Sequence, residues 1–489
     1  MVDPRYQFVW DDREGIWESS DGGLTFGRIS SRADWDSAWS QAFWAITESF
    51  SGPVQTIGED LSDADALYWC NGQFAYASLD RGQSLQSIFA DERSPGFWAS
   101  RGLDNIVTMK IIASEADPDV LYLGSFDIGL WRSLDGGLSW SSCNQAAYTG
   151  SWDGNGGNTL TIAADPDDAS KVWAPQAEAW AGPAQLLKST DSGATWNAVG
   201  SGLPADALLG LSLDRTSPVG GRTLFISAGG DIYRSTDDGA SFALALADGG
   251  LTVTAVDHFN GQIVYAGGRS GLWRSTAGGA PGTWQEVGPA SFRGPAGFDV
   301  WDDGFIGVFD IVPDPFIPGR VYASVTGEGQ FVSDDAGVSW SQILGDPFAR
   351  SVAVSFDDPD VLYAVSSSAL LAGGYDPTSL GLQRSDDGGA TWQSLNAGLP
   401  YPFAVSIALD PRDPCAVMIA SPGVGVRRGT AACPCPADVN RDGQLNAADF
   451  TAWIAASNTL NPACDQNDDG SCTPGDFTAW IANFNAGCP

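Results

Sequence analysis

The stretch "NIVTMKIIASEADPDVLYLGSFDIGLWRSLDGGLSWSSC" (residues 105–143) contains four short strand-like runs separated by turn residues. It ends on the pattern Ser-x-Asp-x-Gly-x-Ser/Thr-aromatic, and the chain repeats this pattern at irregular intervals of 40 to 59 residues. Units of about four strands whose loops vary in length are typical of the blades of a β-propeller. Copies of the pattern begin at Ser19, Ser78, Ser133, Ser189, Ser235, Ser275, Ser333 and Ser385.

The aspartate of each repeat is expected to have a structural role. Asp side chains commonly accept hydrogen bonds from backbone N–H groups in turns, and Gly adopts the left-handed backbone that such turns need. We therefore expect the aspartate to hold the turn between the third and fourth strands, with the aromatic residue packed between blades. The copy at Ser275 has Ala277 in place of the aspartate, which favours a folding role over a catalytic one.

The repeat resembles the Asp box, or BNR repeat, of the propellers found in sialidases, sortilin-like receptors and two-propeller xyloglucanases. This resemblance implies an all-β Asp-box propeller of about eight blades over residues 1–430. It leaves the activity open, because one fold hosts many functions. The ragged N-terminus and the strands without a repeat at residues 403–430 either complete one ring or indicate an upstream portion outside this sequence.

The composition narrows the possible partners and chemistry. The formal charge is −36, so nucleic acid and anionic membranes are excluded for lack of clustered cations. The single histidine, His258, rules out a His-based triad and a His-cluster metal site. No apolar run is long enough to span a membrane. Any catalysis must therefore use carboxylates.

The cysteines indicate an oxidising compartment. Five of the eight lie within the last 57 residues, a density typical of disulfides in extracellular or cell-surface proteins: Cys433, Cys435, Cys464, Cys472 and Cys488. Cys464 with Cys472, or Cys435 with Cys488, are candidate pairs. The N-terminus lacks the zones of a signal peptide, so either a signal has been removed or the chain starts inside a longer one.

The long loops are rich in tryptophan and carboxylates. Loops between blades and between second and third strands are expected to share one face of the propeller, where aromatic rings can stack on sugars while carboxylates accept hydroxyl hydrogen bonds. Each Trp could instead only pack its loop onto the rim. The predicted polysaccharide-binding residues are Trp35, Trp39, Trp44, Trp98, Trp152, Trp180, Trp301, Tyr375, Asp302 and Asp303.

One segment suggests a catalytic residue. "GLDNIVTMKIIASEADPDVLYLGSFDIGLWRS" is similar to the xyloglucanase segment in which an Asp-Ile-Gly sequence follows the second strand of a blade and carries a catalytic aspartate, which here is Asp127. Leu130 stands where that family usually has a second Gly, and the only comparable partner is Asp11 or Asp12, without Ile-Gly. The alternative is that Asp127 caps a turn.

The C-terminal region writes one acidic unit twice. "DVNRDGQLNAAD" and "DQNDDGSCTPGD" place oxygens at positions 1, 3, 5, 7 and 12 of a calcium loop. The last Asp of each loop is also the first residue of the sequence "DFTAWIA". Phe450, Trp453 and Ile454, with Phe477, Trp480 and Ile481, are expected to form a small core between two helices. The predicted ligands of two Ca²⁺ ions are Asp438, Asn440, Asp442, Gln444, Asp449, Asp465, Asn467, Asp469, Ser471 and Asp476.

The paired loops resemble a type I dockerin, the EF-hand-like module that attaches secreted polysaccharide-degrading enzymes to cohesin scaffolds. Residues 437–489 would form this module after a linker at 431–436. Ala447-Ala448 and Pro474-Gly475 stand where a Ser-Thr recognition pair is usual, so the resemblance implies a cohesin-like or other cell-surface partner. The sequence thus predicts a secreted polysaccharide-active propeller of the endo-glucanase or xyloglucanase kind. The alternative is a non-catalytic propeller that binds carbohydrate or protein.

Overall fold

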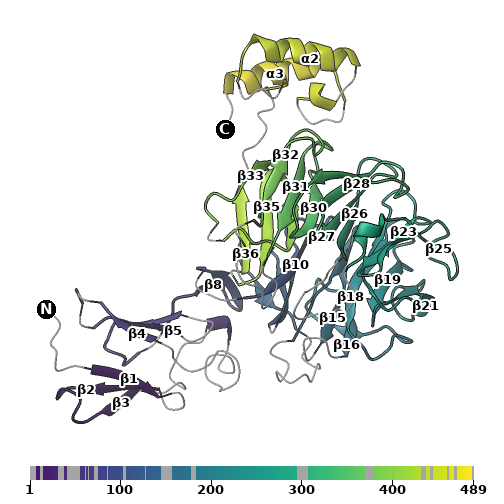
Figure 1. Cartoon of the computed structure of the whole chain (residues 1–489). Helices are drawn as coiled ribbons and strands as arrows, with labels where there is room; N and C mark the ends of the chain where they lie inside the picture. The colour runs from purple at the N-terminus through teal and green to yellow at the C-terminus, as the bar shows by residue number, and fades with distance from the viewer. Residues whose placement is uncertain are drawn as a thin grey trace. The chain divides into compact units, whose positions relative to one another are not determined.

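The computed structural model of the chain, drawn in Figure 1, consists mainly of antiparallel sheets. It divides into two compact units, Met1–Arg412 with Met418–Arg428, and Asp413–Val417 with Gly429–Pro489. The structure describes residues 7–11, 15–30, 38–40, 56–60, 62–63, 65–70, 75–84, 86–102, 106–126, 128–144, 157–177, 183–294, 307–368, 376, 378–399, 401–423, 425–430, 437–440, 444–459, 462–466 and 471–486.

Three sheets come first along the chain, and the described residues between the first two include the short helical turn η2 (Ala38–Ser40). They are the sheet of β1 (Gln7–Asp11), β2 (Gly15–Ser19) and β3 (Gly27–Ser30); the sheet of β4 (Thr56–Glu59), β5 (Leu67–Cys70), β6 (Ala75–Ser78) and β7 (Gln86–Ser87); and the hairpin of β8 (Ala90–Ser94) and β9 (Phe97–Ser100).

Seven sheets follow, and in six of them four strands pair in chain order. These six are β10 (Thr108–Ala113), β11 (Leu121–Ser125), β12 (Gly129–Ser133), β13 (Ser141–Ser142); β14 (Ala163–Asp165), β15 (Asp168–Ala177), β16 (Ala184–Ser189), β17 (Asn197–Ala198); β18 (Leu208–Asp214), β19 (Thr223–Ala228), β20 (Asp231–Ser235), β21 (Ala243–Leu246); β22 (Leu251–Val256), β23 (Val264–Gly268), β24 (Gly271–Ser275), β25 (Trp284–Glu286); β26 (Gly307–Pro313), β27 (Val321–Thr326), β28 (Gly329–Ser333), β29 (Ser341–Leu344); and β30 (Ala349–Val354), β31 (Leu362–Ser366), β32 (Gln383–Ser385), β33 (Gln393–Ser394). The seventh has three strands, β34 (Ser406–Asp410), β35 (Asp413–Ser421) and β36 (Gly425–Thr430), and η3 (Ala290–Phe292) follows β25.

The seven sheets form a closed ring. From β14 onward the first strand of each sheet adjoins the first strand of the next, and the last of them, β34, lies beside β10. The backbone N–H of Ile111 donates to the Ser406 hydroxyl at 3.3 Å across this closure, and that of Thr159 donates to the Ser125 carbonyl at 3.1 Å between the first two sheets. The chain is therefore a β-propeller, as the sequence predicts.

Buried aromatic residues join consecutive sheets of the ring. The second strands of the first six sheets carry Tyr122, Trp173, Phe225, Tyr265, Tyr322 and Tyr363, all of them fully or almost fully buried. A Cβ added to Gly193 in the turn of the second sheet would lie 3.2 Å from the Tyr122 ring, and one at Gly239 would lie 3.1 Å from the Trp173 ring. Phe225 and Tyr265 approach Gly279 and Gly337 in the same way, so these four rings each pack on a turn glycine of the following sheet, where a side chain would not fit.

The repeated turn has the hydrogen bonds expected from the sequence. In the copy at Ser189, Asp191 accepts from the Thr195 backbone N–H at 2.8 Å and the Thr195 hydroxyl at 2.6 Å, and the Ser189 hydroxyl donates to it at 2.7 Å. These bonds, the hydroxyl first, lower the pKa of Asp191 to about 2. Where Ala277 replaces the aspartate, the Ser275 and Thr283 hydroxyls bond directly at 2.7 Å. The structural role of these aspartates is thus confirmed.

The expectation of about eight blades over residues 1–430 is not confirmed, since the ring of described strands contains seven sheets. The expectation counted turns. Two of the eight turns, at Ser19 and Ser78, belong to the sheets β1–β3 and β4–β7 that precede the ring, while the seventh ring sheet, β34–β36, has no such turn.

The two N-terminal sheets nevertheless pack as neighbouring blades do. Arg81, in the turn after β6, donates to Glu18 of β2 at 2.8 Å, and a Cβ added to Gly82 would lie 2.4 Å from the Ile29 side chain. The contact has the same pattern as in the ring, where Arg132 of β12 donates to the Ser192 carbonyl in the next turn at 2.8 Å.

The second unit contains two helices, α2 (Ala447–Thr459) and α3 (Pro474–Ala486), with η4 (Pro462–Cys464) between them. Among the described residues, no helix combines the length and the apolar character needed to cross a membrane.

Candidate functional site

The structure describes two of the ten predicted sugar-binding residues, Trp39 and Trp98. The others, together with Asp127, lie outside the described residues: Trp35, Trp44, Trp152, Trp180, Trp301, Tyr375, Asp302 and Asp303. The structure therefore gives no placement for the loops that carry most of the prediction.

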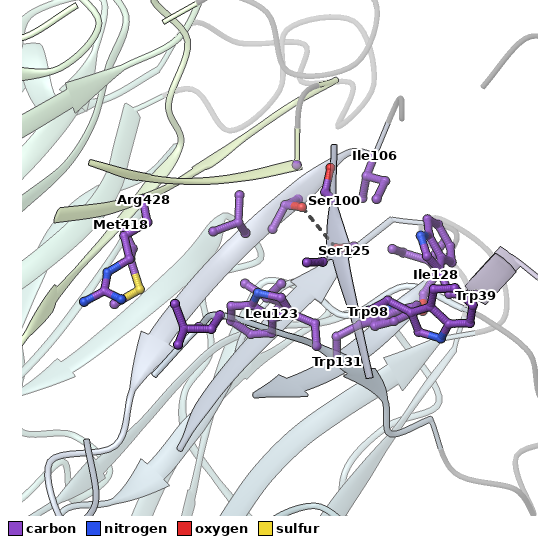
Figure 2. Close-up of a pocket in the computed structure, with 17 residues that line it drawn as sticks. Trp39, Trp98, Ser100, Ile106, Leu123, Ser125, Ile128, Trp131, Met418 and Arg428 are labelled. Atoms are coloured by element: carbon purple, nitrogen blue, oxygen red, sulfur yellow. Dashed lines mark hydrogen bonds between the residues drawn. The ribbon is translucent and has the colours of Figure 1, made fainter. Parts of the chain in front are cut away.

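Trp39 and Trp98 line the same pocket, which we call the seam pocket because it lies where β34–β36 meets β10–β13 (Figure 2). Its volume is about 180 Å³, and Trp131 of β12 and Trp140, just before β13, complete its aromatic wall. Four indole rings from four separate segments thus meet around one cavity. The sequence prediction missed both: it expected Trp140, the aromatic residue of the repeat, to pack between blades, and it made no prediction for Trp131.

The seam pocket exists because the closing sheet departs from the others. A Cβ added to Gly137 would lie 3.3 Å from the sulfur of Met418 in β35. At the corresponding place between other sheets, such as at Gly193 and Gly239, the side chain of the second strand is aromatic. The described part of β34–β36 also has three strands where its neighbours have four. The hairpin β8–β9 approaches here instead, because Trp98 and Trp140 exchange backbone N–H···O=C bonds of 2.8 Å each.

The aromatic wall is held in place edge to face. Trp39 lies 5.0 Å from the Trp131 ring at 82° and 5.8 Å from the Phe89 ring at 90°, a favourable arrangement for aromatic pairs. The Trp131 indole N–H donates to the Ile128 carbonyl at 3.0 Å, which fixes its orientation. These rings are therefore rigid surfaces on which a ligand can stack.

The remainder of the seam pocket is neutral apart from one arginine. Ser125 donates to Thr108 at 3.4 Å, and Figure 2 shows Ser100 and Ser125 between the aromatic end and the end formed by Met418 and Arg428. Arg428 donates to Asp410 at 3.2 Å. No Asp or Glu is among the described lining residues, so the pocket itself offers stacking and hydroxyl contacts and no acid–base pair.

The segment around the predicted catalytic residue adjoins this pocket. Ile128, which follows Asp127, is one of the lining residues. Asn144 clamps the segment, because its amide donates to the Ile128 carbonyl at 2.9 Å and its carbonyl accepts from the Leu130 N–H at 2.8 Å. A Cβ on Gly129 would lie 2.2 Å from the Asn144 carbonyl oxygen, which explains the glycine. Asn396 clamps Gly381 in the same way in the sheet of β30–β33, so the clamp alone is structural.

A second and larger cavity of about 610 Å³ is lined by the first strands of the ring sheets. At one end Arg215 forms an ion pair with Glu115 and lies 3.4 Å from Nδ1 of His258. Burial first, and then Arg215, lowers the pKa of His258 to about 4, so the only histidine is neutral at physiological pH. It is thus a hydrogen-bonding residue there and no proton carrier.

The predicted calcium loops are partly described: Asp442, Asn467 and Asp469 lie outside the described residues. Within the described part, no three His, Cys, Asp or Glu side chains gather as a metal site. Asp449 at loop position 12 is fully buried, accepts N–H bonds from Asn446 at 2.8 Å and Asn440 at 3.4 Å, and has no described Lys or Arg partner. A buried carboxylate without a cation is unfavourable, so this donor set fits Ca²⁺.

The second loop repeats the arrangement. Asp476, also fully buried, accepts from the backbone N–H of Thr473 at 2.6 Å and of Gln466 at 2.9 Å. The halves are tied crosswise, because the Trp453 indole N–H donates to the Cys464 carbonyl at 3.1 Å and that of Trp480 to the Ala437 carbonyl at 3.2 Å. Each helix thus hydrogen-bonds the residue that precedes the other calcium loop.

The predicted core of this unit is only partly right. Trp453 and Trp480 are buried with Ala437. Four other apolar side chains on the helices are each more than a third exposed, because the indoles and the loop residues fill the small interior: Phe450, Ile454, Phe477 and Ile481.

The chain is similar to known proteins, although no protein-family model matches it. Among curated proteins, a xyloglucanase of Paenibacillus sp. is 28% identical over 297 aligned residues, covering 50% of this chain and 26% of that protein. This chain therefore spans about a quarter of that relative's length.

Two kinds of solved structure are similar to the chain. The GH74 xyloglucanase from Xanthomonas campestris is 17% identical with a TM-score of 0.39, covering 88% of this chain and 82% of that chain. YCF48 from Cyanidioschyzon merolae is 14% identical with a TM-score of 0.46, covering 67% of this chain and 96% of that chain.

Proposed function

We propose that this chain is a secreted, polysaccharide-active propeller that binds a neutral β-glucan of the xyloglucan type at the seam pocket. The observation that carries the proposal is the meeting of Trp39 and Trp98 with Trp131 and Trp140 around one cavity, in which Arg428 is the one charged residue of the described lining. Indole faces stack on the C–H faces of sugars, and hydroxyls such as those of Ser100 and Ser125 suit sugar hydroxyls. The xyloglucanase among the curated relatives supports the choice of polymer.

The binding proposal is tested by replacing Trp98, which is only partly buried. Trp98→Ala is expected to weaken binding of a xyloglucan oligosaccharide roughly tenfold or more, as for other aromatic anchors. Isothermal titration with the full chain measures this. Trp273→Ala is the matched control, because Trp273 is also partly buried, stands where Trp131 stands in its own sheet, and lies outside the pocket. Equal losses in both variants would remove the pocket from the proposal.

Hydrolysis is the favoured activity, with Asp127 as the general acid or base. Glycoside hydrolysis needs carboxyl groups on both sides of the scissile bond. Asp127 immediately precedes a residue that lines the seam pocket, so a sugar bound there would lie beside its segment. The rest of the chain would supply substrate binding and exclusion of water.

The expected result is that Asp127→Asn lowers the release of reducing ends from xyloglucan by about 100-fold or more, the usual contribution of a general acid or base. Asp334→Asn, which alters an exposed surface aspartate, should leave the rate unchanged. If the unmodified chain binds xyloglucan and releases no reducing ends, the alternative holds: a non-catalytic carbohydrate-binding propeller.

The tail is proposed to be a calcium-dependent docking module of the dockerin kind, attaching the propeller to a cohesin-like or cell-surface protein. Two buried position-12 carboxylates and the crosswise indole bonds support this proposal. One Ca²⁺ would be held by each loop, with Asp438, Asn440, Gln444 and Asp449 in the first and Asp465, Ser471 and Asp476 in the second among the described residues. Bound Ca²⁺ would neutralise the buried carboxylates and set the helices.

A further inference from the structure

The two proposed calcium loops have the same ligands at four positions. Positions 1, 3, 5 and 12 carry Asp, Asn, Asp and Asp in both loops: Asp438, Asn440, Asp442 and Asp449 in the first, and Asp465, Asn467, Asp469 and Asp476 in the second. Ligand charge is one of two properties that tune calcium affinity in such loops, the other being rigidity. Because the ligand charge is equal, a difference in affinity must arise elsewhere.

The loops differ at the residues that flank these ligands. Cys464, before position 1, and Cys472, at position 8, form a disulfide with their Cα atoms 5.6 Å apart, which confirms one of the predicted pairs. Ala437 and Leu445 occupy the same places in the first loop, where they belong to one apolar cluster with Trp453 and Trp480. The two positions are therefore joined by a covalent bond in the second loop, whereas in the first loop they only share an apolar cluster.

We propose that the Cys464–Cys472 disulfide pre-organises the second loop, so that it binds Ca²⁺ more tightly than the first. The inference rests on the proposed calcium function of the tail. The disulfide closes a segment that holds the ligands at positions 1, 3, 5 and 7, from Asp465 to Ser471. A loop closed by a disulfide has fewer conformations, so it loses less conformational entropy when it binds the metal. The first loop has no such cross-link and loses more conformational entropy on binding.

The neighbouring contacts place the clamp where it can act on the ligands. The Cys464 carbonyl is held by the Trp453 indole at 3.1 Å, and Thr473, next to Cys472, donates both its N–H and its hydroxyl to Asp476 at 2.6 and 3.0 Å. The disulfide thus links the residue before the first ligand to the residues that hydrogen-bond the last ligand, Asp476. Its removal would free both ends together.

Another difference acts in the same direction and must be separated. Position 4 is Arg441 in the first loop and Asp468 in the second, so nearby charge also favours Ca²⁺ at the second loop. The experiment therefore changes only the flanking residues and leaves position 4 as it is.

Calcium titration of the full chain tests the proposal in two backgrounds. Asp438→Ala disables the first loop and leaves the second for measurement, and there Cys464→Ala with Cys472→Leu, the residues of the first loop, is expected to raise the Kd about 5- to 50-fold. Closing so short a segment reduces the number of conformations of a fully unfolded chain on the order of 100-fold. The expected change in Kd is smaller because the loop is already partly ordered in the folded unit. In the Asp465→Ala background, Ala437→Cys with Leu445→Cys is expected to lower the Kd by a similar factor.

In the Asp465→Ala background, where the first loop is intact, protection of the bond after Arg441 from trypsin at saturating calcium shows that each variant is folded. In the Asp438→Ala background, slow hydrogen exchange of the amides of α3 (Pro474–Ala486) at saturating calcium shows the same. An unchanged Kd in the folded Cys464→Ala and Cys472→Leu variant overturns the clamp while the calcium function stands. If neither loop of the unmodified chain binds calcium at millimolar concentration, the proposed calcium function fails, and the clamp with it.

Discussion

Replacing Arg222 with methionine is expected to lower the free energy of unfolding of the propeller by roughly 3–5 kcal/mol, because it leaves a buried carboxylate without its cation. Arg222 and Asp165 are both almost completely buried, and the guanidinium donates to the carboxylate at 2.9 and 2.6 Å. Burial alone would raise the pKa of Asp165, but the bonds from Arg222 outweigh it and hold that pKa below its usual value. Arg222 also donates to the carbonyls of Arg215 and Ser217 in its own loop, so its pair with Asp165 of β14 links two sheets.

Urea unfolding of the full chain measures this effect. Arg293→Met is the control, since Arg293 pairs with Glu286 at the exposed surface and such pairs contribute at most about 1 kcal/mol. Adding Asp165→Asn to Arg222→Met should recover part of the loss, because the charge left unpaired is then gone. Equal effects of Arg222→Met and Arg293→Met would contradict the assignment of Arg222 as a buried structural cation.

Chelation of calcium is expected to abolish the protection of the C-terminal unit against trypsin. Arg441, at position 4 of the first loop, is the only Lys or Arg after Arg428 and therefore reports on this unit alone. Two helices of this length with two buried carboxylates are marginal without a metal. In millimolar calcium the bond after Arg441 should survive, and in excess chelator it should be cut rapidly.

Mass spectrometry after reduction identifies the fragment that begins at Asp442. The tryptic pattern of the propeller is the internal control, since the chelator should leave it unchanged. Cleavage after Arg441 at the same rate with and without calcium would contradict the proposal that the tail is calcium-dependent.

The repeated turns made the propeller fold predictable, but the number of sheets in the ring could not be predicted from them. Each turn encodes its own hydrogen bonds locally, as Ser189 and Asp191 show, so the sequence is enough to identify it. Which sheets close into one ring depends on contacts such as that of Ile111 with Ser406, nearly three hundred residues apart. No local pattern carries that information, and the three strands of the closing sheet lack the turn that marks the others.

The seam pocket was predictable only in part for a similar reason. Trp39 and Trp98 were recognised as loop aromatics, but Trp131 belongs to the sequence "GLWRS", which recurs at residues 271–275, outside the seam pocket. What distinguishes Trp131 is the sheet opposite it, where Met418 stands in place of an aromatic residue. This difference can be seen in the sequence once the ring is known, because β35, the second strand of the seventh sheet, has Met418 where the other second strands have an aromatic residue.

The two helices of the tail, α2 and α3, were predictable because each follows its loop in consecutive residues with apolar side chains at helical spacing. The disulfide between Cys464 and Cys472 was one of two pairs considered, and spacing alone did not separate them. The partial exposure of Phe450 and Phe477 could not be read from helical periodicity, which gives one face of each helix and not the width of the interior.

Hydrogen–deuterium exchange of the full chain with a xyloglucan oligosaccharide locates the bound sugar and so tests whether the seam pocket holds it. Slower exchange is expected in peptides covering residues 97–100 and 123–131, which carry Trp98, Ile128 and Trp131 of the seam pocket, with no such change in the Trp98→Ala variant. Protection confined to other segments, or no protection at saturating sugar, would contradict binding at the seam pocket.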